Sequence, residues 1–167
     1  ANAGKVGVSR NTLWKSDTAN TMKSGTANPV TGADWSSAYT AGADDRVITE
    51  LYDFQDTLFV AKEDGLWYYL RVYPDQTGAD LFINATNEFQ NFPNTDNFAL
   101  GAESNGWLYL ASGAGGLVRT DGRSVQDLLP LVAQPIAGYN GRVRALAADT
   151  VQLWAVVGDR LVSFMPT

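Results

Sequence analysis

The chain has 167 residues, of which 45% are hydrophobic and 18% are charged, and this length and composition predict a single folded domain with its own core. It contains no cysteine and no histidine, which excludes disulfides, a thiol nucleophile, a Ser-His-Asp triad and the usual zinc sites, so we expect no metal and no cofactor. Its net charge of −6 argues against a nucleic-acid partner, and no apolar run reaches the ~20 residues that a membrane helix needs, so no membrane insertion is expected.

Short apolar segments separated by turn residues follow one another along the chain. We interpret Lys5 to Val8 and Thr12 to Lys15 as the second and third strands of a first unit, and Trp35 to Thr40 as its fourth strand. The next unit has four predicted strands, at Arg46 to Tyr52, Thr57 to Lys62, Leu66 to Val72 and about Leu81 to Ala85. We expect Gly65, at the turn before the third of these strands, to have a positive φ.

The same pattern recurs twice more. The third unit has predicted strands at Phe98 to Leu100, Leu108 to Ala111, Gly116 to Arg119 and Asp127 to Val132. The last unit has three, at Val143 to Leu146, Leu153 to Val156 and Arg160 to Ser163, and lacks a fourth. Helical periodicity is hard to find over any stretch of eleven residues or more, which favours an all-β chain.

The spacing of the repeat predicts the architecture. The leucines taken as anchors of the third strands are 53, 51 and 44 residues apart, at positions Leu13, Leu66, Leu117 and Leu161. Units of about 40 to 50 residues are typical of propeller blades. We therefore predict a β-propeller, or a partial propeller, of about 3.5 to 4 four-stranded blades. It forms one domain, 1–167, with repeat units at roughly 1–40, 46–85, 97–133 and 142–167.

One turn of the third unit supports this interpretation. The segment from Gly116 to Ser124 resembles the Asp-box of bacterial neuraminidase-like repeats, although Thr120-Asp121-Gly122 lacks the spacer residues and Val125 stands where an aromatic is expected. In that family the box is a structural turn remote from the catalytic site, so the resemblance implies blade topology and no activity. The succession of hydrophobic, aromatic and Gly-Leu-Trp strands also resembles propeller repeats of phage and environmental virion proteins.

The predicted ring is incomplete. A closed propeller has about four to eight blades, and the predicted end units leave unpaired sheet edges. Three arrangements remain open: a small four-bladed closure within the chain, closure by a second chain, or a piece of a longer polypeptide. Open edges invite other protein chains or self-association, which are the partners that we expect.

Charged residues supply few candidate sites. The acidic pairs Asp44-Asp45 and Glu63-Asp64 show no convergence on a cleft, so we predict no catalytic residue. Arg142 and Arg144 occupy alternate positions of a strand and therefore face one side together, where they could bind an anion in a central channel. Structural pairing with Asp149 or Asp159 is the favoured alternative.

Aromatic residues supply the other candidates. Trp35, Tyr39 and Trp67 could form a platform for a glycan through stacking and hydrogen bonds, with packing between blades as the favoured alternative. The polar stretch from Asn87 to Asn97 lacks the regular calcium-loop spacing, so no metal site is predicted there.

These observations together predict a non-catalytic scaffold or recognition module. The virion resemblance and the open edges favour a virion structural or tail protein, or an extracellular binding protein. The alternatives are a glycan-binding lectin and a sialidase-like glycoside hydrolase.

Overall fold

The computed structural model describes residues 4–25, 28–43, 45–70, 81–85, 94–112, 116–122, 124–128 and 142–165. These residues form β-strands, one turn of 3₁₀ helix at Gly32–Asp34, and the connections between them. No helix in the described ranges is both long enough and apolar enough to span a bilayer. The all-β class predicted from the sequence is confirmed.

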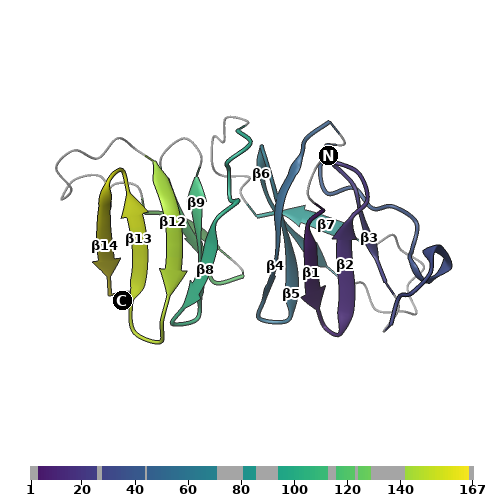
Figure 1. Cartoon of the computed structure of the whole chain (residues 1–167), viewed down its shortest axis with the longest axis horizontal. Coiled ribbons are helices and arrows are strands. Elements are labelled where there is room, and N and C mark those ends of the chain that lie inside the picture. The colour runs from purple at the N-terminus through teal and green to yellow at the C-terminus, as the bar shows by residue number, and fades with distance from the viewer. Residues whose placement is uncertain are drawn as a thin grey trace.

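Four antiparallel sheets succeed one another in chain order. The first sheet contains β1 (Val6–Ser9), β2 (Thr12–Ser16) and β3 (Met22–Ser24). The second contains β4 (Ile48–Phe54), β5 (Thr57–Lys62), β6 (Gly65–Leu70) and β7 (Leu81–Asn84). The third contains β8 (Gly101–Ser104), β9 (Trp107–Ser112), β10 (Gly116–Thr120) and β11 (Val125–Asp127). The fourth contains β12 (Val143–Ala148), β13 (Leu153–Val157) and β14 (Arg160–Phe164), and Figure 1 shows the four sheets in a row with β1–β3 and β12–β14 at opposite ends.

Buried apolar side chains fill the three spaces between neighbouring sheets. The central strand β5 is covered on both faces, which explains its continuous apolar run. Leu58 and Val60 face the first sheet, whereas Phe59 and Ala61 face the third. The third space, between the third and fourth sheets, is filled by Tyr109, Ala111, Leu117, Val143, Leu153, Ala155 and Val157. Face-to-face sheets with a core at each junction form an arc of propeller blades.

Hydrogen bonds and ion pairs repeat the same geometry from blade to blade. At each junction they join residues that are 45 to 51 positions apart in the sequence. The pairs are Lys5–Glu50, Arg10–Asp56, Tyr52–Phe98, Gln55–Gly106, Ser104–Asp149 and Asp96–Arg142. The sequence repeat is therefore also a repeat of contacts in space.

The first blade begins one strand earlier than the sequence spacing predicted. β1 packs against β4 as β12 packs against β8, so β1 is a first strand and not a second one. Leu13 on β2 consequently matches Leu58 on β5, because both lie directly after the hairpin that follows the first strand. The anchor that matches Leu66 is Met22, which pairs with the second strand in the same register.

Other strand predictions differ in detail. The predicted fourth strand Trp35 to Thr40 is a pair of isolated bridges, from Tyr39 to Met22 and from Trp35 to Gly25, at the edge of β3. The strand predicted at Asp127 to Val132 is β11, which ends at Asp127, and residues 129–132 lie outside the described ranges, as do residues 71 and 72.

The prediction for Gly65 was wrong. Gly65 begins β6, and it is absent from the described glycines with positive φ. Left-handed backbone occurs instead in the two-residue hairpins between first and second strands, at Arg10-Asn11, Gln55-Asp56 and Asn105-Gly106. Two-residue hairpins of this kind need positive φ at both positions, because only that geometry matches the twist of the flanking strands.

The turn that resembles the Asp-box joins β10 to β11. Asp121 Oδ1 accepts a hydrogen bond from the backbone N–H of Ser124 at 2.8 Å and from its hydroxyl at 3.1 Å. The carboxylate therefore holds the turn in place, which is a structural role.

Candidate functional site

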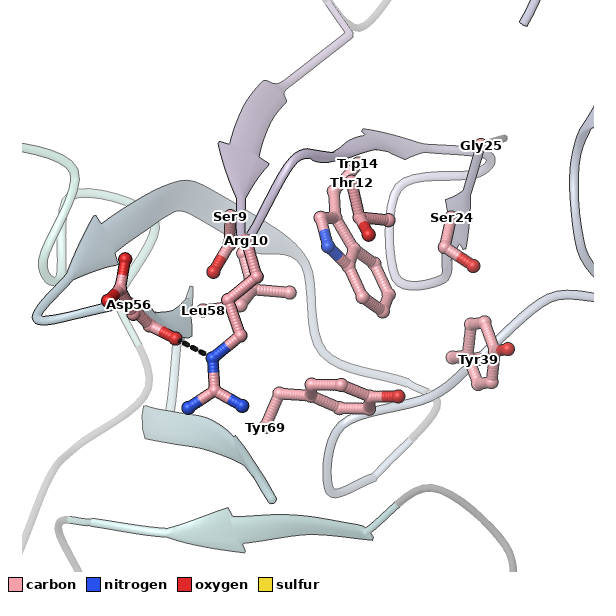
Figure 2. A pocket seen from close by; sticks show the side chains of 10 residues that line it. All are labelled: Ser9, Arg10, Thr12, Trp14, Ser24, Gly25, Tyr39, Asp56, Leu58 and Tyr69. Atoms are coloured by element: carbon pink, nitrogen blue, oxygen red, sulfur yellow. Dashed lines mark hydrogen bonds between the residues drawn. The ribbon is translucent and has the colours of Figure 1, made fainter. Parts of the chain in front are cut away.

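A cavity of about 300 Å³ lies between the first and second sheets. Its lining comes from both strands of the first hairpin, from the edge of the first sheet and from β5 and β6, as Figure 2 shows. The lining residues are Ser9, Arg10, Thr12, Trp14, Ser24, Gly25, Tyr39, Asp56, Leu58 and Tyr69. We refer to this cavity as the blade pocket.

One wall of the blade pocket is aromatic. The ring centroids of Trp14 and Tyr69 lie 5.1 Å apart in an edge-on arrangement, and those of Trp14 and Tyr39 lie 5.7 Å apart. Tyr39 is fixed by two backbone hydrogen bonds to Met22, of 2.7 and 3.0 Å. Trp14 is 3% exposed, whereas both tyrosines are half-buried, so the tyrosine rings offer most of the aromatic surface to a ligand.

The other wall is polar. Arg10 is held in the first hairpin with a φ of +48°, and its Nε donates a hydrogen bond to the backbone carbonyl oxygen of Asp56. Figure 2 places Arg10 and Asp56 on one side of the pocket and Trp14 and Tyr39 on the other. Hydroxyl groups of Ser9, Thr12 and Ser24 complete the polar lining. Aromatic rings facing a few polar groups are typical of a site for a small polar ligand.

The groups with shifted pKa values lie elsewhere. Backbone hydrogen bonds lower the pKa of Asp34 and of Asp149. Burial, and then the negative charge of Asp53, raise the pKa of Glu103, while burial, and then Glu50, raise the pKa of Tyr52. None of these four residues lines the blade pocket.

The structure separates the three aromatic residues that the sequence singled out. Tyr39 lines the blade pocket. Trp35 lies outside the lining, with Nζ of Lys15 4.1 Å from its ring centroid. Trp67 is 6% exposed and packs in the core between the first and second sheets, as the alternative of packing between blades predicted.

The two arginines lie away from the blade pocket. Arg142 and Arg144 line a second cavity, of about 390 Å³, between the third and fourth sheets. Arg142 pairs with Asp96, which the sequence did not suggest, and Arg144 lies 3.6 Å from Asp159, one of the two expected partners. Each arginine thus has a carboxylate beside it.

Arg10 and Trp14 are candidate residues that the sequence reasoning missed. Assigning Trp14 to a third strand placed its side chain at the wrong position in the blade. A signal was present in the sequence. Once β1 is taken as a first strand, Leu13-Trp14-Lys15 aligns with Leu58-Phe59-Val60, and Trp14 then occupies the position of Phe59, which faces the next blade.

Comparison with known proteins supports the fold. No protein-family model matches the chain, and no curated protein matches it. YCF48 from Cyanidioschyzon merolae, a propeller protein, has a similar structure, with a TM-score of 0.60 at 15% identity over 96% of this chain and 49% of that one. The computationally designed Ika4 protein matches with a TM-score of 0.58 at 14% identity, over 96% of this chain and 89% of that one.

The sheets, their junctions and the YCF48 match define the class: the chain is a partial β-propeller of four blades. It spans about half the length of the YCF48 chain.

Proposed function

We propose that this protein is a non-catalytic recognition module and that the blade pocket binds a saccharide. The observation that carries the proposal is the pairing of an aromatic wall, formed by Tyr39 and Tyr69 beside Trp14, with the polar wall of Arg10 and Asp56. Sugar rings stack on aromatic side chains through their C–H faces, and their hydroxyls exchange hydrogen bonds with arginine and carboxylate groups.

The absence of a second acid in the lining supports binding without catalysis. Most glycosidases use two carboxyl groups on either side of the scissile bond, whereas sialidases use a tyrosine nucleophile together with a cluster of arginines that binds the substrate carboxylate. Among the described residues that line the blade pocket, Asp56 is the one acidic residue and Arg10 is the one arginine, so neither set is complete. We therefore place the lectin alternative ahead of the sialidase-like hydrolase.

Saccharide binding is tested with a glycan array followed by calorimetric titration of the best ligand. Arg10→Asn is the informative variant, because asparagine tolerates the left-handed backbone of this hairpin and removes the guanidinium. We expect it to weaken binding at least tenfold. Gln55→Asn is the matched control: it occupies the same hairpin position in the second blade, lies outside the pocket lining, and should leave affinity unchanged.

Two results would contradict the proposal. An array without any bound glycan, or an Arg10→Asn variant that binds like the wild type, would refute saccharide recognition in this pocket. Cleavage of a bound oligosaccharide, detected by mass spectrometry, would refute the non-catalytic role.

A place in a virion or in an extracellular assembly stays a prediction of the sequence, as do the Asp-box and virion resemblances. A recognition module with open blade faces suits either setting, because both need a protein that joins a ligand to a larger assembly. Immunogold labelling of purified virions or of the source culture would test this prediction.

A further inference from the structure

Within the described ranges, no sheet covers the outer face of the first sheet or of the fourth sheet, at the two ends of the blade arc. The first sheet turns Val6, Val8, Leu13, Lys15 and Lys23 away from the second sheet, and we name this surface the N-terminal face. The fourth sheet turns Ala145, Ala147, Trp154, Val156, Leu161 and Ser163 away from the third, and we name this surface the C-terminal face. Val6 is 60% exposed and Leu161 is 67% exposed, although both lie within strands.

Several of these positions are buried where a neighbouring blade is present, whereas Val8 matches Asp53, which stays exposed there. Val6 and Leu13 match Leu51 and Leu58 of the second blade, which are 6% and 1% exposed. On the opposite face, Leu161 matches Leu117 of the third blade, which is 2% exposed. Each end face is therefore one half of a blade junction of the kind that the chain forms three times internally.

The internal junctions show which side chains would meet. At the first junction the added methyl group of an alanine at Gly7 would lie 3.1 Å from Cβ of Leu51. At the second junction, Gly101 of the third sheet approaches the ring of Tyr52 of the second sheet. The small residue therefore belongs to the earlier sheet at the first junction and to the later sheet at the second. On the N-terminal face Val6 matches Leu51, and on the C-terminal face Ala147 matches Gly7. These two positions would therefore face each other, and a medium side chain would pack against a small one.

A ring of two chains has two junctions between copies, one at each end of every chain. A standard protein interface removes about 800 Å² from each partner, so two junctions of that size would cover about 1,600 Å² of each chain.

We infer that two copies of this chain close one ring, with the C-terminal face of each copy packed on the N-terminal face of the other. The four blades of this chain align with about half of the YCF48 chain, which is consistent with one copy supplying part of a propeller ring. The product has eight blades, which is within the usual range of about four to eight. The interface is head-to-tail and closes by two-fold rotation. This inference does not depend on saccharide binding.

Light scattering coupled to size-exclusion chromatography tests ring closure. We expect the wild type to have twice the 18.0 kDa mass of the chain. Val6→Lys and Ala147→Glu, on opposite end faces, should each give a folded monomer, verified by circular dichroism. Mixing the two variants should restore the doubled mass, because one junction is then wild type and the other pairs lysine with glutamate.

The control variant is Val30→Lys, since Val30 is 79% exposed and lies on neither end face, and it should keep the doubled mass. A wild-type chain that stays monomeric at tens of micromolar would overturn the inference. That result is expected if further blades of a longer polypeptide cover the end faces. Loss of association with Val6→Lys alone, with Ala147→Glu unaffected, would indicate a symmetric pairing of N-terminal faces and would also overturn it. Masses that grow without limit with concentration would indicate an open filament instead of a ring.

Discussion

Lys62, at the end of β5, is a fully buried lysine. Its side chain has no exposed surface, and Nζ donates hydrogen bonds to the backbone carbonyl oxygens of Ala41 and Ala43. Nζ also lies 5.5 Å from the ring centroid of Trp67. The lysine thereby ties the segment after the first blade to the second blade.

We predict that Lys62→Met destabilises the protein by about 2 to 3 kcal/mol, because buried carbonyl groups lose a charged donor while the apolar volume is kept. Urea denaturation measures the change. Lys5→Met removes a half-exposed ion pair with Glu50, lies on neither end face, and should cost less than about 1 kcal/mol. Equal stability of the Lys62→Met variant and the wild type would contradict this role.

Asp149 is a second residue with a local structural role. The backbone N–H groups of Val151 and Gln152 each donate to its carboxylate at 2.7 Å, and the indole N–H of Trp154 donates at 3.4 Å. These bonds hold the pKa of Asp149 below its ordinary value of 3.8. They shape the connection between β12 and β13.

A lowered pKa in the folded state stabilises the protein above the unfolded pKa, and this contribution disappears as the pH falls through the folded value. We therefore predict that the stability difference between the wild type and Asp149→Asn is complete above about pH 5 and shrinks on acidification below about pH 4. Urea titrations at a series of pH values measure it. A difference that stays constant from pH 6 to pH 2 would contradict the prediction.

At the scale of elements, close approach between blades restricts residue size. A methyl group added at Gly101 would lie 2.5 Å from Cε1 of Tyr52 on β4 and 2.9 Å from Leu110 on β9. Tyr52 is itself fixed by a hydrogen bond of 2.6 Å from its hydroxyl to the carbonyl oxygen of Phe98. The second junction therefore depends on a glycine at position 101.

We predict that Gly101→Ala destabilises the chain by about 1 to 3 kcal/mol through overpacking. Tyr52→Leu should relieve the clash. The double variant should therefore lose less free energy of unfolding than the sum of the losses in the two single variants. Gly32→Ala serves as a control, because nothing lies within 4 Å of the added methyl group. Strict additivity in a double-mutant cycle would show that the two residues do not compete for space.

At the scale of the whole molecule, the four blades differ in how much of each is covered. β5 and β9 have neighbours on both faces, whereas β1 and β14 belong to the open end faces. In stacked architectures each unit is stabilised mainly by its neighbours, so end units open more easily. The end blades are thus the weakest part of an isolated chain.

We predict that, in the monomeric Val6→Lys variant, amide hydrogens of β5 and β9 exchange at least tenfold more slowly than those of β1 and β14. Hydrogen-exchange mass spectrometry measures the difference. In the wild type, protection of β1 and β14 should rise with protein concentration, because ring closure covers them. Uniform protection across all blades of the monomer would contradict the prediction.

The strands and the repeat were accessible from the sequence for a local reason. An apolar pattern with turn residues at its ends indicates a strand whatever surrounds it, and Thr57 to Lys62 was predicted with the bounds of β5. The register of the first blade was not accessible in this way. Leu13 fits a second or a third strand equally well, and only the packing of β1 against β4 assigns Leu13 to a second strand, β2.

The sequence by itself determined an all-β chain of repeated blades without thiol or imidazole chemistry, because composition and period act locally. Only the tertiary structure decided which faces are covered. The blade pocket combines residues from Ser9 to Tyr69 that no spacing connects. Val6 and Leu161 are exposed because, in the part of the chain that the structure describes, no sheet covers the outer faces of the first and fourth sheets. Burial depends on segments far apart in the chain, so no local pattern encodes it.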